Sequence, residues 1–328
     1  MSALRRYERI ITHNDFDGVV SGAICAWTFG VDHFVFVGPL TITKSQITIT
    51  EKDIVCDLPY PLQCGLWFDH HEGNREELGY RGIALQSIPG RFDLKPSCSR
   101  VVYEYCAGQK DLPLRFLQAV EEADIIDSFS YASIEEWREK TAGKVIDWTL
   151  KAHFKTSHDQ FAYLRNLVQQ LRDRPIEEVA ELSFVRERFK QYQEEEARMF
   201  KIIQDSSSFL EPDQPKEIMV IDLTAYQRRP HLIKNLGFLI HPESLAVLEI
   251  YNLFEQGVKS NHLGLSMSLS IKANQGGGKN IGEIMRILNI GDGHPGAAAG
   301  TIRCKSKQEM LKKKKEILDQ IFKLWSSQ

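Results

Sequence analysis

Several features that would place the chain in a specialised class are missing from its sequence. The six cysteines form no Cys-x-x-Cys pair and have no regular spacing, so neither a disulfide framework nor a zinc site is predicted. No apolar run approaches the roughly 20 residues that cross a bilayer, and the opening MSALRRYERI lacks the apolar core of a signal peptide. The formal net charge is −3, which gives no overall basic surface for nucleic acid. We therefore expect a cytoplasmic protein with buried, reduced thiols and no membrane partner.

The first half of the chain alternates between strand-like and helix-like runs. Strands are predicted at 33–38, 53–60 and 64–71, and helices at 97–108 and 112–129, with Ser97 as the residue that caps the first helix. Alternation of this kind is typical of a parallel sheet covered by helices. The run YERIITH before His13 adds a strand near the start, and the small apolar residues after Gly18 predict a helix.

The second half predicts a long helix followed by a second sheet. From 149 to 206 the chain is helical and strongly charged, and the helix that follows Pro175 runs for many turns without glycine or proline. The segment 205–217 interrupts it, and IMVIDLT, LAVLEIYNLF and LGLSMSLSI then read as strands, HLIKNLGFLI as a helix. We predict an α/β protein with three parts: a parallel-sheet domain with flanking helices at 1–175, a helical linker at 176–214, and a smaller α/β domain with a mixed sheet at 215–328.

Acidic and imidazole side chains follow three of the predicted strands of the first domain. A further acidic spot lies on the helix 112–129. Because the carboxyl ends of parallel strands meet at one edge of the sheet, we expect these groups to converge there. The set comprises His13, Asp15 and Asp17, then Asp57, then Asp69, His70 and His71, and finally Asp124 or Asp127.

Such a convergence predicts a metal site. Carboxylates that share one site repel each other and raise one another's pKa, and divalent cations remove that cost. Carboxylate together with imidazole suits manganese, iron or zinc, whereas carboxylate with water suits magnesium. An aspartate at one strand end is by itself an ordinary turn residue, and a lone histidine is ordinarily a surface or core group. Four such groups in order along the chain favour a metal site over these ordinary interpretations.

The motifs HNDFDG, isolated Asp57, DHH and a later aspartate resemble the four ordered motifs of the DHH phosphoesterase superfamily. That superfamily includes RecJ-type exonucleases, nanoRNase/pAp phosphatases, cyclic-dinucleotide phosphodiesterases and exopolyphosphatases. The segment GDGHPGAAAG, residues 291–300, resembles the GGGH-x-x-AAG loop of the DHH-associated domain. The resemblance thus covers both domains, and it disfavours the manganese pyrophosphatases, which lack that loop.

The resemblance implies a role for each residue of the set. It implies that His13 and Asp15 hold one metal, that Asp17, His70 and Asp124 hold the other, and that Asp57 bridges the two. Asp127, about a turn from Asp124, is the alternative fourth ligand. Asp69 would orient a histidine, and His71 would face the substrate phosphate or leaving group, so that His71, Asp57 and Asp69 form the expected catalytic set. The implied cofactors are two divalent ions, Mn²⁺ or Mg²⁺.

Glycine-rich backbone in the second domain predicts an anion site. Glycine and alanine let backbone N–H groups approach a phosphate closely. We expect Gly291, Gly293, His294 and Lys272 to bind substrate, with Lys279 as a further candidate. Asp292 stands where the family has a glycine, and an acid there would weaken a phosphate contact or point away.

The expected activity is metal-dependent hydrolysis of phosphodiester or phosphomonoester bonds in short oligonucleotides or nucleotides. Exopolyphosphate hydrolysis is an alternative because few aromatic residues surround the glycine loop. A non-catalytic nucleotide or phosphate sensor is a second alternative. The expected partner is an oligonucleotide, nucleotide or other phosphate chain, and a homodimer is left open.

Overall fold

The computed structural model describes residues 7–328, which form two compact units. One unit comprises residues 7–131 and Arg138–Gln193, and the other comprises Ala132–Trp137 and Glu194–Gln328. The predicted linker 176–214 is therefore divided between the two units, inside its long helix. No helix within the described range is both long and apolar enough to cross a membrane.

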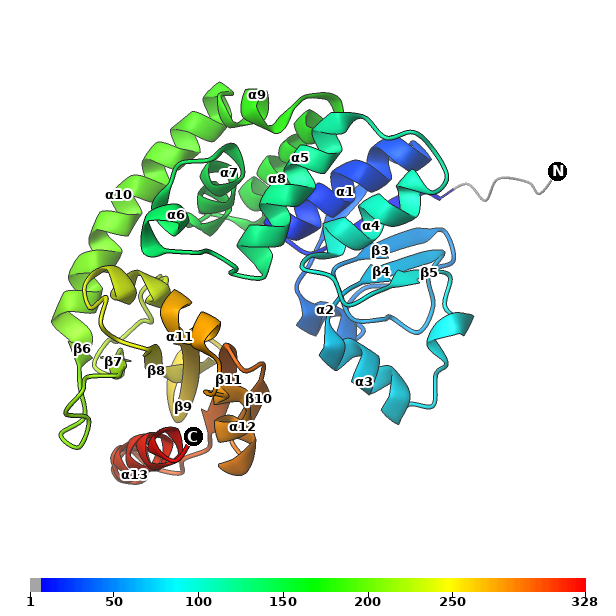
Figure 1. Cartoon of the computed structure of the whole chain (residues 1–328). Helices are drawn as coiled ribbons and strands as arrows, with labels where there is room; N and C mark the ends of the chain where they lie inside the picture. The colour runs from blue at the N-terminus through cyan, green and yellow to red at the C-terminus, as the bar shows by residue number, and fades with distance from the viewer. Residues whose placement is uncertain (1–6) are drawn as a thin grey trace. The chain divides into compact units, whose positions relative to one another are not determined.

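The first unit is built on a five-stranded parallel sheet (Figure 1), and the α/β prediction is confirmed. The strand order is β2-β1-β3-β4-β5. Strands β1, β3 and β4 are neighbours, so the three segments that carry the motif residues end side by side. The strand bounds are β1 Arg9–Thr12, β2 Phe34–Phe36, β3 Asp53–Cys56, β4 Leu66–Asp69 and β5 Gly90–Phe92.

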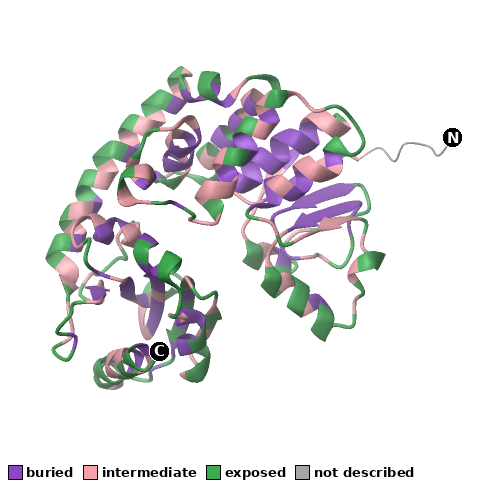
Figure 2. Ribbon diagram, in the orientation of Figure 1, coloured by how far each residue is buried: buried purple, intermediate pink, exposed green. Residues whose placement is uncertain are grey.

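Alternate residues of each strand enter two separate cores. Ile10, Ile54 and Phe68 pack into the larger core, together with α1 (Phe16–Phe29), α4 (Cys98–Ala107), α5 (Leu114–Asp127) and α8 (Ser157–Asp173). Val55 and Trp67 face the smaller core under α2 (Pro39–Thr43) and α3 (Glu72–Tyr80). Because helices cover both faces of the sheet, the side chains that alternate between the faces are apolar on both. Figure 2 shows the sheet and α1 as the most buried part of the unit. The remaining helices of this unit are α7 Ala142–Lys151 and α9 Ile176–Ala180, whereas α6, Ile134–Arg138, lies in the second unit except for Arg138.

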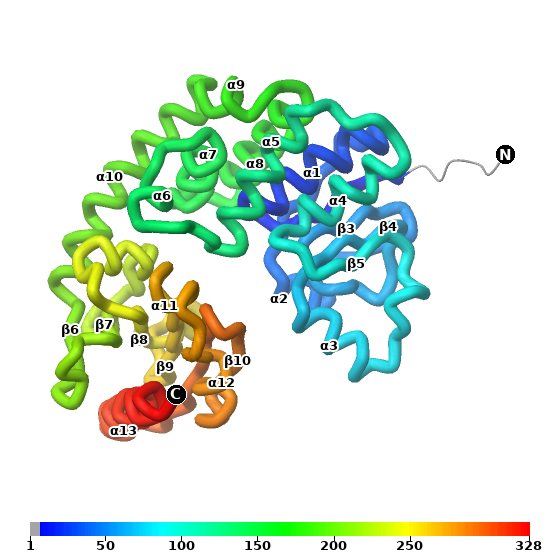
Figure 3. Tube along the Cα trace, in the orientation of Figure 1, coloured from blue at the N-terminus to red at the C-terminus, as the bar shows by residue number. Residues whose placement is uncertain are grey.

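The second unit contains a six-stranded mixed sheet in the order β10-β11-β9-β8-β7-β6. Within this sheet β7 and β8 run parallel, and the other neighbours are antiparallel. One face packs on α12 (Ile281–Ile287) and α13 (Lys307–Ser326), whose Trp325 is fully buried. Figure 3 follows the chain of this unit from β6 and β7 to the C-terminal α13. The strands are β6 Ser207–Ser208, β7 Ile218–Asp222, β8 Ala246–Glu255, β9 Val258–Leu269, β10 Gly291–Gly293 and β11 Ala297–Ile302.

Two predicted helices differ in the structure. The helix after Pro175 is interrupted: α9 ends at Ala180 and α10 spans Ser183–Ser206. The segment HLIKNLGFLI forms only the 3₁₀ helix η2, Lys234–Leu239. Within η2, a β-carbon on Gly237 would lie 2.0 Å from the terminal methyl of Met219, so a larger residue there would have to displace that side chain.

Candidate metal centre

The turn between β1 and α1 explains the spacing of the first motif. Asp15 caps α1, and its Oδ1 accepts a hydrogen bond of 2.9 Å from the Gly18 amide. Its Oδ2 lies 2.5 Å from Nδ1 of His13. A β-carbon on Gly18 would lie 2.3 Å from the His13 carbonyl oxygen, so this tight turn requires glycine.

Asp17 lies in the first turn of α1 and is held by another helix. Its two carboxylate oxygens accept hydrogen bonds from the backbone amides of Cys98 at 2.7 Å and Ser99 at 2.8 Å. These amides belong to the first turn of α4, where the N-terminal N–H groups lack partners within the helix. The side chain is thereby fixed in a buried position, with Oδ2 3.9 Å from Nε2 of His70.

Asp57 follows β3 in a conformation that few non-glycine residues adopt. Its φ is 57°, in the left-handed region, and the residue is 2% exposed. Both carboxylate oxygens are buried, and neither has a hydrogen-bond partner among residues 7–328. Oδ2 lies 3.4 Å from Nδ1 of His13, and Oδ1 lies 3.7 Å from Nε2 of His70. Asp57 therefore stands between the first and third motifs.

The two histidines of the DHH motif are oriented differently. Nδ1 of His70 lies 3.0 Å from the Lys95 carbonyl, an acceptor, so in the neutral ring Nδ1 donates and Nε2 carries the lone pair. That Nε2 is buried without a hydrogen-bond partner among the described residues. Nδ1 of His71 instead lies 2.9 Å from Oδ1 of the fully buried Asp69, whose other oxygen accepts a 2.7 Å hydrogen bond from Asn74. His70 thus presents a ligand nitrogen to the cluster, and Asp69 positions His71.

Asp127 lies in the cluster, whereas Asp124 does not. Oδ2 of Asp127 lies 3.3 Å from Nε2 of His70. Asp124 instead accepts hydrogen bonds from the Arg100 guanidinium, the shorter 2.6 Å long, and from the Ser97 hydroxyl at 2.7 Å. The implied assignment of Asp124 is therefore not supported by its position, because a guanidinium already neutralises it. The two residues lie about one helical turn apart on α5, and the sequence alone does not distinguish them.

The carboxylates of the cluster repel one another, and a bound cation would relieve that repulsion. Burial, together with the charges of Asp15 and Asp17, holds the pKa of Asp57 well above its usual range. Burial and the same two charges raise the pKa of Asp127 to about 8. Burial alone would lower the pKa of His71, but the hydrogen bond to Asp69 and the nearby carboxylates outweigh it and raise the pKa to about 9.

These residues fit a divalent-metal centre. Three groups place their ligand atoms within 4.8 Å of one another: His13 with Asp15 and Asp57; Asp17 with His70 and Asp127; and Asp57 with His70 and His71. Asp57 is shared between groups, and its unpartnered oxygens and the Nε2 of His70 are the donor atoms that a hard or borderline cation takes.

The raised pKa values predict an inverted pH dependence of stability in the metal-free protein. Asp57 and Asp127 keep protons in the folded state that the unfolded chain releases near pH 4, and His71 keeps its proton to about 9. Each contribution is present at low pH and is lost as the pH rises. We expect the melting temperature in EDTA to fall from pH 6 to pH 9. Mn²⁺ should raise it more at pH 9, since ligands bind deprotonated. Asp57→Asn should flatten the slope in EDTA, and an unchanged slope would contradict this account.

The glycine-rich loop forms a tight β-hairpin in the second unit. A β-carbon on Gly291 would lie 1.9 Å from the Ala299 carbonyl oxygen, so the strands β10 and β11 approach closely. The amide of Gly293 donates to Asp292, and the amide of His294 donates to the Ala297 carbonyl, so both are used inside the hairpin. The exposed His294 ring has no hydrogen-bond partner in the described part of the chain. A phosphate contact here would rest on this ring rather than on those two amides.

The charged residues near the hairpin have separate surroundings. Arg286 pairs with Asp292 at 2.7 Å, so the acid that replaces the family's glycine is neutralised by a cation. Lys279 donates to the Trp325 carbonyl and lies over its indole ring, which makes it a structural residue. Lys272 is exposed on α11, Ile271–Gly276, and makes no hydrogen bond or ion pair with any residue from 7 to 328.

The groups that position the cluster were not found by sequence reasoning. These are the Lys95 carbonyl behind His70, Asn74 behind Asp69, and the α4 amides behind Asp17. Each acts through backbone atoms or an ordinary surface residue type, so no sequence pattern marks it.

The fold is the one that the motifs predicted, since the chain is similar to several solved structures of this two-unit architecture. Among solved structures, the chain is similar to the pGpG-specific phosphodiesterase PggH from Vibrio cholerae. The TM-score is 0.70 at 23% identity, over 96% of this chain and 98% of that one. It is also similar to RecJ from Thermus thermophilus in complex with Mn²⁺, with a TM-score of 0.53 at 13% identity, over 97% of this chain and 52% of that one.

A third similar structure is an exopolyphosphatase-related protein from Bacteroides fragilis, with a TM-score of 0.51 at 10% identity, over 98% of this chain and 94% of that one. No family model matches the chain, and no curated protein matches it. At these identities the similarity establishes the fold, and the activity has to be argued from the site.

Proposed function

We propose that the protein is a metal-dependent phosphoesterase that hydrolyses phosphate ester bonds of short oligonucleotides or nucleotides. The observation that carries this proposal is Asp57, whose two unpartnered, buried oxygens lie between a His13–Asp15 group and a His70–Asp127 group. A carboxylate shared in this way is the arrangement in which two metal ions are bridged.

The proposed ligands follow from position. His13, Asp15 and Asp57 would hold one ion, and Asp17, Asp57, His70 and Asp127 would hold the other. When bound, Mn²⁺ or Mg²⁺ would lower the pKa of a water and neutralise charge on a phosphate.

His71 is the proposed general acid. The hydrogen bond to Asp69 raises the pKa of its ring, which favours the protonated form that a general acid needs. Asp69 holds the Nδ1 proton, so the Nε2 proton is the one available for an oxygen that leaves phosphorus. The ring is about 41% exposed, which leaves it accessible to a substrate.

Product analysis tests the proposal directly. The purified protein would be incubated with Mn²⁺ or Mg²⁺ and a panel of pGpG, pAp, RNA of two to five nucleotides, a cyclic dinucleotide and tripolyphosphate. pGpG enters the panel because a similar structure over nearly the full chain is a pGpG-specific phosphodiesterase. We expect metal-dependent release of mononucleotides or phosphate. Metal binding without hydrolysis of any panel member would leave the sensor alternative.

The neighbouring aspartates of α5 give a matched pair of variants. Asp127→Asn should lower the hydrolysis rate at least about a hundredfold, or ~2.7 kcal/mol, because it removes a proposed ligand. Asp124→Asn should lower the free energy of unfolding by about 1–2 kcal/mol, because Arg100 loses its charged partner. Its rate per folded molecule should stay within about threefold of wild type. The reverse ranking of rates would restore Asp124 as the ligand.

The two adjacent histidines should separate in a manganese titration. His70→Ala should raise the Mn²⁺ concentration needed for half-maximal activity, because it removes a ligand nitrogen. His71→Ala should lower the rate at saturating Mn²⁺ instead, because it removes the proton donor. Measuring the rate across Mn²⁺ concentrations distinguishes the two effects, and identical titration curves for both variants would refute the division of roles.

A further inference from the structure

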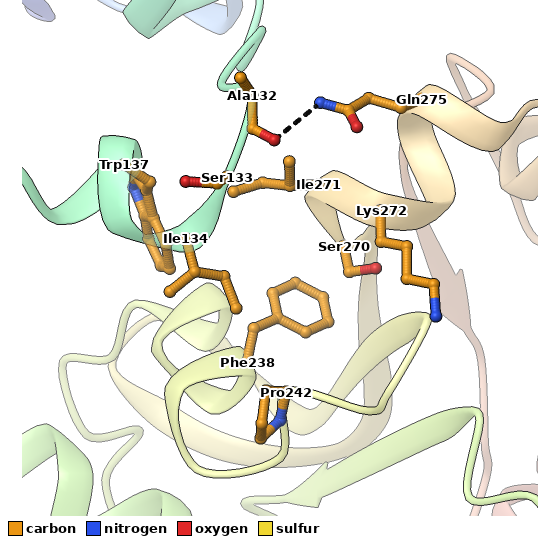
Figure 4. Close-up of a pocket in the computed structure, with 10 residues that line it drawn as sticks. All are labelled: Ala132, Ser133, Ile134, Trp137, Phe238, Pro242, Ser270, Ile271, Lys272 and Gln275. Carbon is orange, nitrogen blue, oxygen red and sulfur yellow. Dashed lines mark hydrogen bonds between the residues drawn. The ribbon is translucent and has the colours of Figure 1, made fainter.

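A cavity of about 230 Å³ lies within the second unit, and none of the residues that line it is among the proposed metal ligands. Three segments enclose it (Figure 4): Ala132–Trp137, the stretch from η2 to Pro242, and the beginning of α11. It is smaller than the roughly 300–1,000 Å³ pockets that take drug-sized ligands. It therefore suits a single ring system better than a whole dinucleotide.

The interior of the cavity is aromatic and aliphatic. Figure 4 shows the Phe238 ring near the centre of the hollow, with Ile134 and Trp137 on one side. Phe238 is 2% exposed and Trp137 is 7% exposed, so both rings are held firmly by their surroundings. Only the rims of the two rings reach the cavity, and Ile134 and Pro242 supply the more accessible apolar surface, so a flat ligand would gain apolar burial there.

The opposite side of the cavity is polar and carries one cation. Ser270 and Lys272 lie there in Figure 4, and Gln275 donates a 3.3 Å hydrogen bond to the Ala132 carbonyl at the top of the opening. The ammonium group of Lys272 has no hydrogen-bond or ion-pair partner between residues 7 and 328. None of the described residues that line the cavity carries a carboxylate. A ligand that combines a flat ring with a negative charge matches both sides.

We propose that this cavity binds the nucleobase of a nucleotide whose phosphate pairs with Lys272. The inference deepens the proposed function and depends on it for the substrate class: the substrate would be nucleotidic rather than a bare polyphosphate. A polyphosphate chain could pair with Lys272, but it would leave the apolar side of the cavity, with Ile134 and Pro242, unused. Apolar contacts with the flat face of a base do not distinguish one base from another, so the cavity by itself favours nucleotides as a class.

Binding measurements on the full-length protein in EDTA test the cavity without reference to catalysis. The probes are GMP, AMP, ribose 5-phosphate and tripolyphosphate, measured by calorimetry and by the intrinsic fluorescence of the five tryptophans, one of which is Trp137. We expect GMP and AMP to bind at least tenfold more tightly than ribose 5-phosphate, which has the phosphate but no base. Ile134→Trp fills the cavity and should remove that difference. Lys272→Gln should weaken binding of nucleotides and ribose 5-phosphate alike.

Two exposed positions on α13 provide controls, namely Leu311→Trp and Lys315→Gln. Neither should change any of the affinities, and the melting temperature of every variant shows whether it is folded. Equal affinity of wild type for GMP and ribose 5-phosphate, or a folded Ile134→Trp variant with unchanged preference, would overturn the inference. Base-selective binding without hydrolysis of the panel would uphold the cavity and refute the phosphoesterase. Hydrolysis of the panel without base-selective binding would uphold the phosphoesterase and refute the role of the cavity.

Discussion

Asp57→Ala is expected to abolish metal-dependent hydrolysis almost completely. Oδ2 of Asp57 lies 3.4 Å from Nδ1 of His13 and Oδ1 lies 3.7 Å from Nε2 of His70, so the carboxylate adjoins both proposed metal groups. Its loss should therefore weaken binding of both ions, whereas loss of a terminal ligand affects one. A variant that retains more than a tenth of the wild-type rate, a difference of about 1.4 kcal/mol, would contradict the bridging role. The measurement is the hydrolysis rate at saturating Mn²⁺ with the best substrate of the panel.

Asp57→Asn is the control that keeps the fold. Asparagine also tolerates the left-handed φ of 57° and preserves the volume of the side chain. Removing a carboxyl whose pKa is held well above normal by its neighbours should raise the melting temperature of the metal-free protein. An inactive variant that is stabilised in the absence of metal would show that the cluster is maintained at a cost in stability. A destabilised Asn variant would show that Asp57 has a structural role instead.

His294→Ala is expected to act on full substrates and far less on a minimal one. If the exposed ring at the hairpin binds a phosphate of the substrate, its removal should lower kcat/KM for a short oligonucleotide or nucleotide at least about a hundredfold, or ~2.7 kcal/mol. Binding energy from a remote contact orients the reacting phosphate. Bis-p-nitrophenyl phosphate is too small to use that contact and should lose about tenfold or less.

The surroundings of His294 indicate that this substitution removes the ring without disturbing the fold. The side chain is exposed and the hairpin is held by backbone hydrogen bonds, so the fold does not depend on the ring. His158→Ala, at an exposed position of α8, is the matched control and should leave kcat/KM unchanged for both substrates. Equal losses on both substrates would place His294 at the reacting phosphate. No loss on either would make the hairpin a purely structural turn.

The residues that converge at the sheet edge could be predicted because local patterns mark the strands and the carboxyl ends of parallel strands share one edge. The segments before His13, Asp57 and Asp69 are apolar strands, and β1, β3 and β4 indeed lie side by side. The fourth position could not be predicted in this way. Asp124 and Asp127 lie on one helix, and the choice between them depends on Arg100, which lies 24 residues from Asp124 in sequence. Long-range ion pairs of this kind leave no periodic signal in the sequence.

The second sheet was predicted as strands, but its details depend on close packing. Gly291 and Gly293 were expected to cradle an anion, whereas the structure uses the Gly293 and His294 amides within the hairpin. The segment around Gly237 was expected to be a helix because its apolar spacing fits one, and its close approach to Met219 is a tertiary contact. The cavity beside Phe238 was not predicted either, because three distant segments form it.

The excursion of Ala132–Trp137 into the second unit has a consequence for dissecting the protein. The chain passes between the units at three points, after Tyr131, after Trp137 and after Gln193, rather than at one hinge. A C-terminal fragment that begins at residue 194 would lack the segment that covers Phe238 and Ile271, and would expose both to water. An N-terminal fragment that ends at residue 193 would carry Ile134 and Trp137 without the residues of the second unit that line the cavity with them. The two units are therefore not interchangeable modules: a chimera that exchanges the second unit has to carry residues 132–137 with it.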